Sequence, residues 1–559
     1  MDINKSIEKI LVRPSSAVLR NLDLSDQSLE ELPAQVLKTE NLGILDLSDN
    51  ALSVLSKGLC DLTTLQQLNV EHNFISEIPE CIAQLKNLQA FDCSNNELET
   101  LSLALCALLE LKVLGLQQNR LKTLPLELAK LTKLRSFKLE NNPLGSIPAV
   151  IGQLSSLEIL DLSDTKISAL SDNFGALSCL KWLDLSINKF EVLTDQLATC
   201  KALVYLDISH NKIKTIEKNA LGEGAALIEL NMEGNPLKAL PKAICQLPNL
   251  ERLDLISTQL LRLPEEIGNL KALKYLNASF NYLEALPDSI GTLEALTQLD
   301  VSENQLEGLP KSFAALKNLE VLNIELNPLE HLPLVVCELM NLKDLDLTGI
   351  ELTQLPYSIC NLVQLKRLDL SENFLEELPP QIGELPALEI LDLRENQLDA
   401  FPVEFANLRT LKELHLEYNL FLELGPEIGE LVKLKQLDVS YNELEELPEN
   451  FTQLQRLERL NLEGNALSTI PREVFSLQRI KELDLSDNQI NKVPDLIANL
   501  AKLRWLDLRN NQLTELPMEL GFLAEVLEEL YLEGNYFREE EKEAIIDLLP
   551  KTNIYFDLD

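Results

Sequence analysis

The sequence is poor in the residues that most often carry out catalysis or bind metals. Only four of its 559 residues are histidines, and only two are tryptophans. No histidine stands at metal-ligand spacing from a cysteine or a carboxylate, and none accompanies a plausible nucleophile. A GxxxxGK[ST] phosphate-binding loop is also missing. These absences predict a protein that is not an enzyme and that has no catalytic residue, no cofactor and no metal site.

Basic residues are also scarce relative to acidic ones. The chain has 49 Lys and Arg against 89 Asp and Glu, which gives a net charge of −40. Because binding to phosphate backbones requires clustered Lys and Arg, we expect no nucleic-acid partner. Residues 301–450 alone hold 10 basic and 29 acidic side chains. The C-terminal half is therefore expected to attract a basic protein, although the excess acid also serves to keep a long chain soluble.

A single pattern, L-x-x-L-x-L-x-x-N-x-L-x-x-L-P, fills the chain from about residue 19 to 535 and recurs nearly always every 23 residues. A fixed period of this length indicates a solenoid. The alternating leucines predict one short strand per repeat, paired in parallel with its neighbours. The proline favours an extended or 3-10 path between strands. We predict an α/β solenoid of about 23 repeats, shaped as a horseshoe, with a parallel β-sheet on its concave face and extended or 3-10 segments on its convex face.

The ends of such a stack expose core leucines and require caps. Residues 1–18 place Ile3, Ile7 and Ile10 on one helical face and predict an N-terminal helical cap. Residues 536–559 predict a C-terminal cap made of one helix and a closing strand. The repeat array between them is expected to be continuous over residues 19–535.

The repeat asparagine is predicted to bury its amide in the turn after each strand and to bond backbone groups there. Thr165, Thr258 and Ile350 stand in its place in three repeats. A threonine makes only part of these bonds and an isoleucine makes none, so looser turns are expected at these three positions.

The nine cysteines show no disulfide pattern. They include no CxxC pair, and five of them fall ten residues after the asparagine position: Cys60, Cys106, Cys245, Cys337 and Cys360. We interpret them as small apolar side chains of the repeat. The segment MDINKSIEKILV lacks the features of a signal peptide, and the longest apolar stretch is too short to cross a bilayer. A soluble protein in the reducing cytoplasm, without contact to a membrane, is therefore expected.

These repeats resemble the intracellular class of leucine-rich repeat proteins with 23-residue LPxxI-type repeats. The class includes the Scribble and Erbin repeats, the Shoc-like scaffold and the plant intracellular Ras-group-related proteins. The closing segment EEEKEAIIDLLPKTNIYF is similar to the terminal cap of bacterial cytoplasmic members. The resemblance implies an intracellular, non-enzymatic scaffold for protein–protein interaction, with a role in signalling.

The seventh to ninth repeats depart from the pattern, because Ser171, Thr194 and Glu217 replace the usual proline and the ninth repeat contains Gly222 and Gly224. Large side chains also occupy positions expected to face solvent on the concave side. We predict an apolar anchor there, rimmed by lysines and suited to an acidic, amphipathic segment of a partner. Its residues are Ile159, Trp182, Tyr205, Ile187 and His210, the rim lysines Lys166, Lys189 and Lys212, and Tyr275 and Phe280 as an extension. The alternative is that these side chains only pack on one another across strands.

A secondary, acidic partner surface is predicted within residues 301–450. Tyr418 and Tyr441 stand at the same position of adjacent repeats there, and Glu376, Glu377, Glu445 and Glu446 are nearby in sequence. This surface suits a basic partner.

The outward column of aspartates, which includes Asp161, Asp184 and Asp207, is able to attract basic side chains or cations, but the LDLS sequence around it is also the common filler of such repeats.

Two other functions remain open at this point. One is a stoichiometric inhibitor, an acidic immunity-type protein that covers a basic enzyme or toxin. The other is a bacterial effector that is secreted without a signal peptide and binds a host signalling protein.

Overall fold

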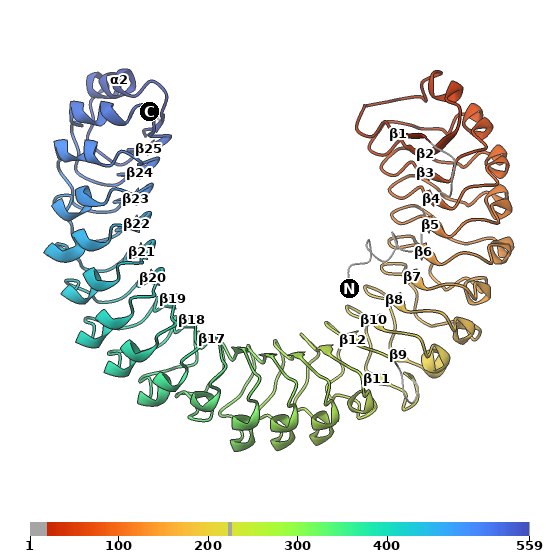
Figure 1. The fold of residues 1–559 in the computed structure, drawn as a ribbon, viewed down its shortest axis with the longest axis horizontal. Coiled ribbons are helices and arrows are strands. Elements are labelled where there is room, and N and C mark those ends of the chain that lie inside the picture. The colour runs from red at the N-terminus through yellow and green to blue at the C-terminus, as the bar shows by residue number, and fades with distance from the viewer. Residues whose placement is uncertain (1–19, 222–225, 558–559) are drawn as a thin grey trace. The chain divides into compact units, whose positions relative to one another are not determined.

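The computed structural model describes residues 20–221 and 226–557, which form two compact units. Unit 1 comprises Met1–Tyr282 and unit 2 comprises Leu283–Asp559 (Figure 1). The predicted helical cap at residues 1–18, and Gly222 and Gly224, lie outside the described residues.

Unit 1 contains one short strand per repeat, and each strand of its main sheet pairs in parallel with the next. The strands are β1 (Arg20–Asp23), β2 (Leu42–Asp46), β3 (Gln67–Asn69), β4 (Ala90–Asp92), β5 (Val113–Gly115), β6 (Ser136–Lys138), β7 (Ile159–Asp161), β8 (Trp182–Asp184), β10 (Tyr205–Asp207), β12 (Glu229–Asn231), β13 (Arg252–Asp254) and β14 (Tyr275–Asn277).

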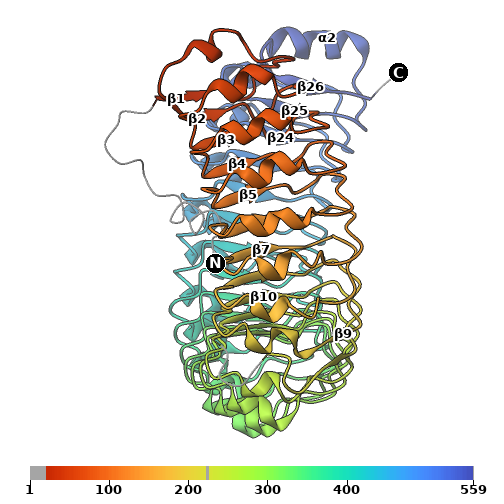
Figure 2. The same cartoon turned by 90° about the vertical axis from the view of Figure 1, so that its right-hand side faces the viewer.

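Short 3-10 helices lie on the opposite side of unit 1 from the strands (Figure 1), and Figure 2 shows them stacked one above another. They are η1 (Val36–Lys38), η2 (Lys57–Asp61), η3 (Glu80–Gln84), η4 (Leu103–Ala107), η5 (Leu126–Lys130), η6 (Ile151–Gln153), η7 (Phe174–Ala176), η8 (Asp195–Thr199), η9 (Ile244–Gln246) and η10 (Glu265–Asn269).

Unit 2 repeats this arrangement. Its strands are β15 (Gln298–Asp300), β16 (Val321–Asn323), β17 (Asp344–Asp346), β18 (Arg367–Asp369), β19 (Ile390–Asp392), β20 (Glu413–His415), β21 (Gln436–Asp438), β22 (Arg459–Asn461), β23 (Glu482–Asp484), β24 (Trp505–Asp507), β25 (Glu529–Tyr531) and β26 (Asn553–Tyr555). Its 3-10 helices are η11 (Asp288–Thr292), η12 (Lys311–Ala315), η13 (Val336–Glu338), η14 (Tyr357–Asn361), η15 (Pro380–Glu384), η16 (Val403–Asn407), η17 (Pro426–Glu430), η18 (Glu449–Gln453), η19 (Arg472–Ser476), η20 (Asp495–Asn499) and η21 (Met518–Leu523).

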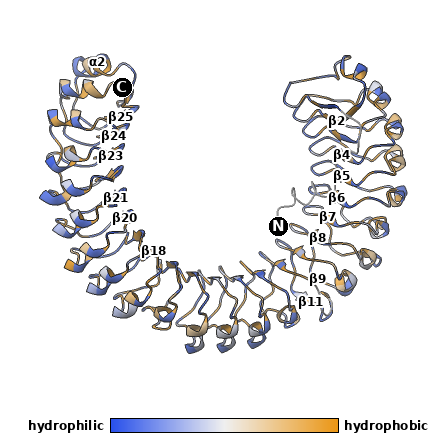
Figure 3. Cartoon of the chain, viewed as in Figure 1, coloured by the Kyte–Doolittle hydropathy of each residue, from blue (hydrophilic) through white to orange (hydrophobic). Residues whose placement is uncertain are grey.

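The predicted solenoid of parallel strands and 3-10 segments is thus confirmed, as is the cap of helix and strand in unit 2. The α-helix α2 (Glu539–Leu548) buries Ile545 and precedes β26, which pairs in parallel with β25. The repeat leucines of each unit are buried between the strands and the 3-10 helices. Figure 3 shows hydrophilic and hydrophobic residues interspersed along the repeats. Within the described residues, no helix is both long and apolar enough to cross a membrane.

The repeat asparagine forms the predicted bonds and links each repeat to the one before it. Asn188 donates from its Nδ2 to the carbonyl oxygens of Leu162 and Leu185, at 2.7 and 3.0 Å. Its Oδ1 accepts the backbone N–H of Ile167 of the preceding repeat at 3.0 Å. One buried amide therefore satisfies backbone groups of two repeats that lie too far from water to be hydrated.

Where threonine or isoleucine replaces this asparagine, the preceding repeat changes its path. Each of the three replaced positions follows an Asn-Pro-Leu sequence one repeat earlier. In the preceding turn, Leu329 donates its N–H to Asn327 of its own repeat, and Glu330 donates to the carbonyl oxygen of Ile350. The same two bonds occur before Thr165 and before Thr258. The missing acceptor is thus compensated by a proline-directed turn in the repeat before it.

The missing prolines of repeats eight and nine have a direct structural consequence. Strands β9 (Val192–Leu193) and β11 (Thr215–Ile216) form a separate two-stranded parallel sheet. Glu217 occupies the usual proline position, and its N–H donates to the carbonyl oxygen of Leu193 at 2.9 Å. A proline has no N–H and would be unable to make this bond.

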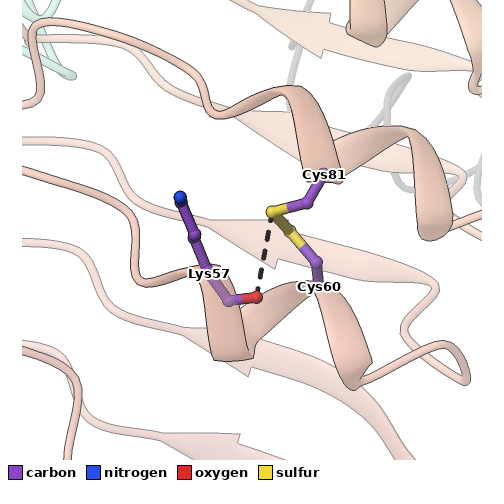
Figure 4. Close-up of a disulfide and its surroundings, with 3 residues drawn as sticks. All are labelled: Lys57, Cys60 and Cys81. Atoms are coloured by element: carbon purple, nitrogen blue, oxygen red, sulfur yellow. Dashed lines mark hydrogen bonds between the residues drawn. A yellow bond between two sulfur atoms is a disulfide. The ribbon is translucent and has the colours of Figure 1, made fainter.

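The interpretation of Cys60 as a small apolar residue without a partner is wrong. Cys60 of η2 and Cys81 of η3 form a disulfide, with their Cα atoms 5.7 Å apart (Figure 4). The two residues occupy different positions of adjacent repeats, and therefore no shared sequence register indicated the pairing. The disulfide removes the cysteine argument for a reducing compartment.

A candidate partner-binding surface on the strand face of unit 1

The outer face of each strand presents two columns of side chains. In β8, Leu183 points into the core, while Trp182 and Asp184 are half-buried on the opposite face. Strand pairing aligns these positions across neighbouring repeats. The first column reads Ser136, Ile159, Trp182, Tyr205, Glu229, Arg252, Tyr275, and the third-position column reads Lys138, Asp161, Asp184, Asp207, Asn231, Asp254, Asn277.

Trp182 and Tyr205, called the aromatic pair here, stack across β8 and β10. Their ring centroids are 5.1 Å apart and their planes are nearly parallel, at 3°. Aromatic pairs in this arrangement contribute about 1 kcal/mol beyond the burial of their surface. Both side chains remain half-buried, so the pair has a solvent-facing part.

Ile159 does not belong to the exposed surface, contrary to the expectation from its position. Its side chain is only 4% exposed and packs with Val113, while Trp182 lies against this cluster. The indole covers Ile159 because the two residues are direct cross-strand partners. Ile159 therefore packs beneath the indole of Trp182 and is not available to a partner.

Asp161 on β7, Asp184 on β8 and Asp207 on β10, called the carboxylate row here, run beside the aromatic pair, which lies on β8 and β10. One oxygen of each carboxylate accepts the backbone N–H of a serine two residues later. The Oδ2 of Asp207 also accepts from Asn231 at 2.9 Å and from the Tyr205 hydroxyl at 3.3 Å.

The position of Asp184 between two other carboxylates changes its acidity. Burial and the charges of Asp161 and Asp207 raise the pKa of Asp184 to about 7. Burial likewise raises the pKa of Asp161. Among the described residues, no lysine or arginine forms an ion pair with the carboxylate row. The row is therefore a cluster of acidic groups without an ion pair, although Lys138 opposes part of the rise in the pKa of Asp161.

Ile187 and His210 lie just after β8 and β10, where the backbone is left-handed, with φ of 54° and 50°. A β-branched residue is strongly disfavoured in this conformation, at a cost of about 1 to 3 kcal/mol. Ile187 is nevertheless 54% exposed and so gains little from burial. His210 is half exposed, with Nε2 3.5 Å from Glu233, and its ring lies against Gly234.

The predicted lysine rim is exposed. Lys166, Lys189 and Lys212 follow the turn asparagine position and point to solvent. None of the three forms an ion pair with another described residue. The carboxylate row was not assigned to this site from the sequence. Because the row lies at the centre of the surface, that centre is more acidic than the exposed lysines alone indicate.

Tyr275 and Phe280, the predicted extension, are separated from the aromatic pair by Glu229 and Arg252 of the same column. The guanidinium of Arg252 stacks on Tyr275, with Cζ 3.6 Å from the ring centroid. Phe280 is 53% exposed and, like Ile187, has a positive φ. The structure therefore does not place these two aromatic residues in contact with the aromatic pair.

In unit 2, Tyr418 and Tyr441 stack at 4.5 Å with their planes 2° apart. Both residues have a positive φ, and the Tyr441 hydroxyl donates to Glu463 at 2.6 Å. The predicted acidic neighbours Glu376, Glu377, Glu445 and Glu446 are exposed. In the part of the chain that the structure describes, no hydrogen bond or ion pair connects these four glutamates to the tyrosines.

One apolar surface was missed from the sequence. Leu334 and Tyr357, both strongly exposed, line a shallow hollow in unit 2 together with Glu377. The sequence did contain a signal for this surface, because both apolar residues directly follow the proline of consecutive repeats. The described residues also include no cluster of His, Cys, Asp or Glu able to hold a metal ion.

Comparison with known proteins identifies two matching family models. The model described as leucine rich repeat matches residues 17–75, 132–190, 180–237, 409–467 and 455–513. The model described as leucine-rich repeat region matches residues 265–355 and 356–425. Together these ranges span more than half of the chain. No curated protein sequence matches.

Solved structures of similar fold come from bacteria and plants. The Arabidopsis receptor kinase HAESA, solved in complex with the peptide hormone IDA and the co-receptor SERK1, is 25% identical, with 98% of this chain and 92% of that chain covered and a TM-score of 0.56. YopM from Yersinia enterocolitica is 25% identical, with coverages of 92% and 91% and a TM-score of 0.50. A leucine-rich repeat protein of Leptospira interrogans is 29% identical, with coverages of 99% and 98% and a TM-score of 0.42.

Proposed function

This chain belongs to the leucine-rich repeat family, and we propose that it is a non-enzymatic scaffold that binds partner proteins on the strand faces of its units. The observation that carries the proposal is the surface at repeats seven to nine. There an aromatic pair and an exposed isoleucine lie beside three carboxylates, none of which forms an ion pair with a lysine or arginine among the described residues. Aromatic side chains in such settings are frequent anchors of protein interfaces.

The backbone at Ile187 supports a binding role over simple packing. A glycine or asparagine would suit its left-handed conformation at lower cost, and the equivalent position of other repeats does contain Gly234, Gly349 and Gly464. Packing does not account for the isoleucine, because half of its surface faces water. An apolar contact from a partner would supply the missing stabilisation.

Relatives of similar fold are consistent with this role. The HAESA structure contains a bound peptide hormone and a co-receptor. We infer a protein or peptide partner for this chain from the same fold together with the surface described above. A cytoplasmic location is part of the proposal and rests on the resemblance of the repeats to intracellular leucine-rich repeat proteins, since the cysteine argument no longer holds.

For the surface of unit 1, we revise the charge of the partner that was predicted from the sequence. The exposed lysines Lys166, Lys189 and Lys212 favour an acidic amphipathic segment, but the carboxylate row lies closer to the aromatic pair, on the same strands. An acidic segment that covers Trp182 would face Asp184 directly. A partner that is basic at this point avoids this repulsion.

A second candidate function is a stoichiometric inhibitor of a basic enzyme or toxin. The observation that favours it is the excess of acid in residues 301–450 of unit 2, where Tyr418 and Tyr441 offer an exposed stacked pair. In this case the basic partner would bind unit 2, and its association rate would fall steeply with salt.

The test is affinity capture from native lysate with the full chain as bait. Trp182→Ala combined with Tyr205→Ala should abolish capture of the partner, while the matched pair Tyr418→Ala and Tyr441→Ala should leave it intact. Circular dichroism and thermal unfolding serve as the control for folding. Equal capture by a folded Trp182 and Tyr205 variant would refute binding at repeats seven to nine. Loss only in the unit 2 variant would instead favour the inhibitor.

A further inference from the structure

We propose that an apolar column on the 3-10 helix side of unit 2 binds an amphipathic helix of a partner protein, with lysines or arginines on both flanks of its apolar face. The column, called the outer stripe here, consists of the residues that directly follow the proline position in five consecutive repeats. They are Leu334, Tyr357, Pro380, Val403 and Pro426. The inference goes beyond the binding function proposed for the strand faces, because it concerns side chains at the 3-10 helices.

The outer stripe interrupts a position that is charged in the repeats of unit 2 on either side of it. Lys311 precedes the stripe, and Glu449 and Arg472 follow it. Each of these three is the first residue of its 3-10 helix, as Tyr357 is of η14 and Val403 is of η16. The fold therefore accepts a charge at this position, and a run of five apolar residues is not required by the repeat.

The outer stripe is exposed and continuous. Leu334 and Tyr357 are 65% and 71% exposed, and Val403 is exposed to a similar extent. Leu334, Tyr357 and Pro380 line one hollow, and the successive 3-10 helices from η13 to η17 pack on one another. Single exposed apolar residues are common on protein surfaces, but a contiguous group of them marks a surface that gains from being covered.

The positions that flank the outer stripe are acidic. In the same five repeats, the third, fourth, eighth and eleventh residues after the turn asparagine position include ten carboxylates and no lysine or arginine. They include Glu330, Glu376 and Glu377 before the stripe and Glu338, Glu384 and Glu404 after it. Within the described residues, only Glu430 of the ten forms an ion pair, with Arg409 at 3.1 Å. A partner that carries positive charge on both sides of an apolar face therefore complements this surface.

Unit 1 contains apolar residues at the same position without acidic flanks. Leu103 and Leu126 occupy it in consecutive repeats and are as exposed as Leu334. Their flanking positions hold two carboxylates and two lysines, Glu99, Glu127, Lys122 and Lys130. Apolar exposure and an acidic surrounding thus coincide at the outer stripe of unit 2, and the pair in unit 1 serves as a matched control.

The backbone at the outer stripe favours a helical partner over an extended one. Pro356, Pro379 and Pro402 cap η14, η15 and η16 and have no N–H to donate. An extended segment would find few backbone partners here, whereas a helix forms its own backbone hydrogen bonds. Four steps between repeats, at the ~4.8 Å spacing of paired strands, cover at least about 19 Å. A helix of about 13 residues or more spans this length.

The probe is a fluorescently labelled synthetic peptide of about 18 residues. It carries leucines on one helical face, lysines on both flanks and alanines elsewhere. One control peptide has glutamates in place of the lysines, and a second has the same composition in an order that scatters the leucines around the helix. Fluorescence anisotropy with the full chain should show saturable binding of the first peptide and much weaker binding of both controls.

Leu334→Asp combined with Tyr357→Asp separates apolar contact from charge. Aspartate occurs at this position elsewhere in unit 2, at Asp288 of η11 and Asp495 of η20, so the variant should fold. Attraction by charge alone would strengthen binding of the lysine peptide, because the variant is more acidic. Loss of two apolar contacts should instead weaken the affinity by about tenfold or more.

Two further variants are compared with it. Leu103→Asp combined with Leu126→Asp adds the same charge at the same position of unit 1 and should leave the affinity unchanged. Glu376→Gln combined with Glu377→Gln removes two flanking charges. It should weaken binding several-fold and make the affinity less dependent on salt.

Unchanged or tighter binding by the Leu334 and Tyr357 variant would overturn the proposal, as would equal binding of the peptide with scattered leucines. Self-association of the full chain that this variant abolishes would also overturn it, because the occupant would then be a second copy. The variant with Trp182→Ala and Tyr205→Ala should bind the peptide as the native chain does. Failure of this inference is therefore distinguishable from failure of the function proposed for the strand face of unit 1.

Discussion

Single residues in the left-handed turns after the strands connect stability and binding most directly. At Ile187 a β-branched side chain occupies a backbone conformation that suits glycine, and its surface is mostly exposed. A residue that lowers stability without packing in the core is a candidate for selection by function. The same left-handed backbone occurs at Phe280, whose φ is 54°.

Ile187→Gly should therefore stabilise unit 1 and weaken partner binding at the same time. Relief of the left-handed strain is expected to contribute about 1 kcal/mol, reduced by the greater freedom of glycine in the unfolded chain. Urea unfolding measures the first effect, and capture of the partner measures the second. Phe280→Gly is the matched control, with a similar gain in stability and unchanged binding at repeats seven to nine. A destabilised Ile187→Gly variant would show that the isoleucine is a packing residue.

The acidity of Asp184 makes a second prediction at this scale. Because the folded state raises its pKa from 3.8 to about 7, the folded state binds the proton more tightly than the unfolded state. Stability contributed by the neutral carboxyl is thus complete below pH 4 and is lost as the pH rises toward 7. Asp184→Asn removes this titration. The free energy of unfolding of the variant should therefore rise relative to that of the native protein as the pH increases through this window, by a few kcal/mol at most.

Urea unfolding of both proteins between pH 4 and pH 8 measures this difference. The two curves should nearly coincide at pH 4 and separate by pH 8, with the variant more stable. A constant difference at all pH values would mean that burial and the charges of Asp161 and Asp207 do not raise the pKa of Asp184.

At the scale of the repeat element, most of the fold could be predicted from the sequence, because the positions that define the strand recur with a fixed period. The turn asparagine could be predicted for the same reason, since a buried amide has few other places to bond. The features that the sequence did not predict arise from contacts between residues at different positions of neighbouring repeats. The Cys60–Cys81 disulfide joins two different positions of the pattern, and Ile159 is buried against Val113 with Trp182 packed on it.

The candidate site was only partly predictable for a related reason. The sequence identified Trp182 and Tyr205 as neighbours because they share one column of adjacent strands. It did not identify Asp184 as part of the same site, because aspartate is also the most frequent residue of its column. Among the described residues Asp184 forms no ion pair, whereas Asp254 accepts a bond from Arg252, and this difference is a property of the folded arrangement.

The pairing of Asn-Pro-Leu with a replaced asparagine is a correlation between successive turns, and it makes a prediction at this scale. Ile350→Asn alone should destabilise unit 2 by about 1 to 3 kcal/mol, because the new buried amide oxygen finds no donor: Leu329 already bonds to Asn327. Adding Pro328→Gln should restore the regular turn and recover most of this loss.

A double-mutant cycle of urea unfolding free energies measures the coupling between the two positions, which should exceed about 1 kcal/mol. Asn304→Ala, at a regular turn of the same unit, provides the reference cost of losing the amide. If the effects of Ile350→Asn and Pro328→Gln are simply additive, the two turns are independent.

At the scale of the whole molecule, the net charge of −40 acts on folding and on binding in opposite directions. Folding brings the carboxylates closer together, and the exposed ion pairs of the chain, such as Lys181 with Glu158, each contribute less than about 1 kcal/mol. Self-repulsion should therefore dominate, so that added salt stabilises the fold by screening it. Attraction of a basic partner depends on the same charges and should weaken with added salt.

The prediction is a rise in the thermal unfolding midpoint at pH 7 when sodium chloride increases from about 20 to 200 mM, a range over which the screening length falls to less than 10 Å. Over the same range, capture of a basic partner should weaken. Near the isoelectric point of about 4.5 the net charge vanishes, so the effect of salt on the midpoint should be small there. A midpoint that falls with salt at pH 7 would mean that the exposed ion pairs outweigh the repulsion, and that the acidic surplus is locally neutralised and unavailable to a basic partner.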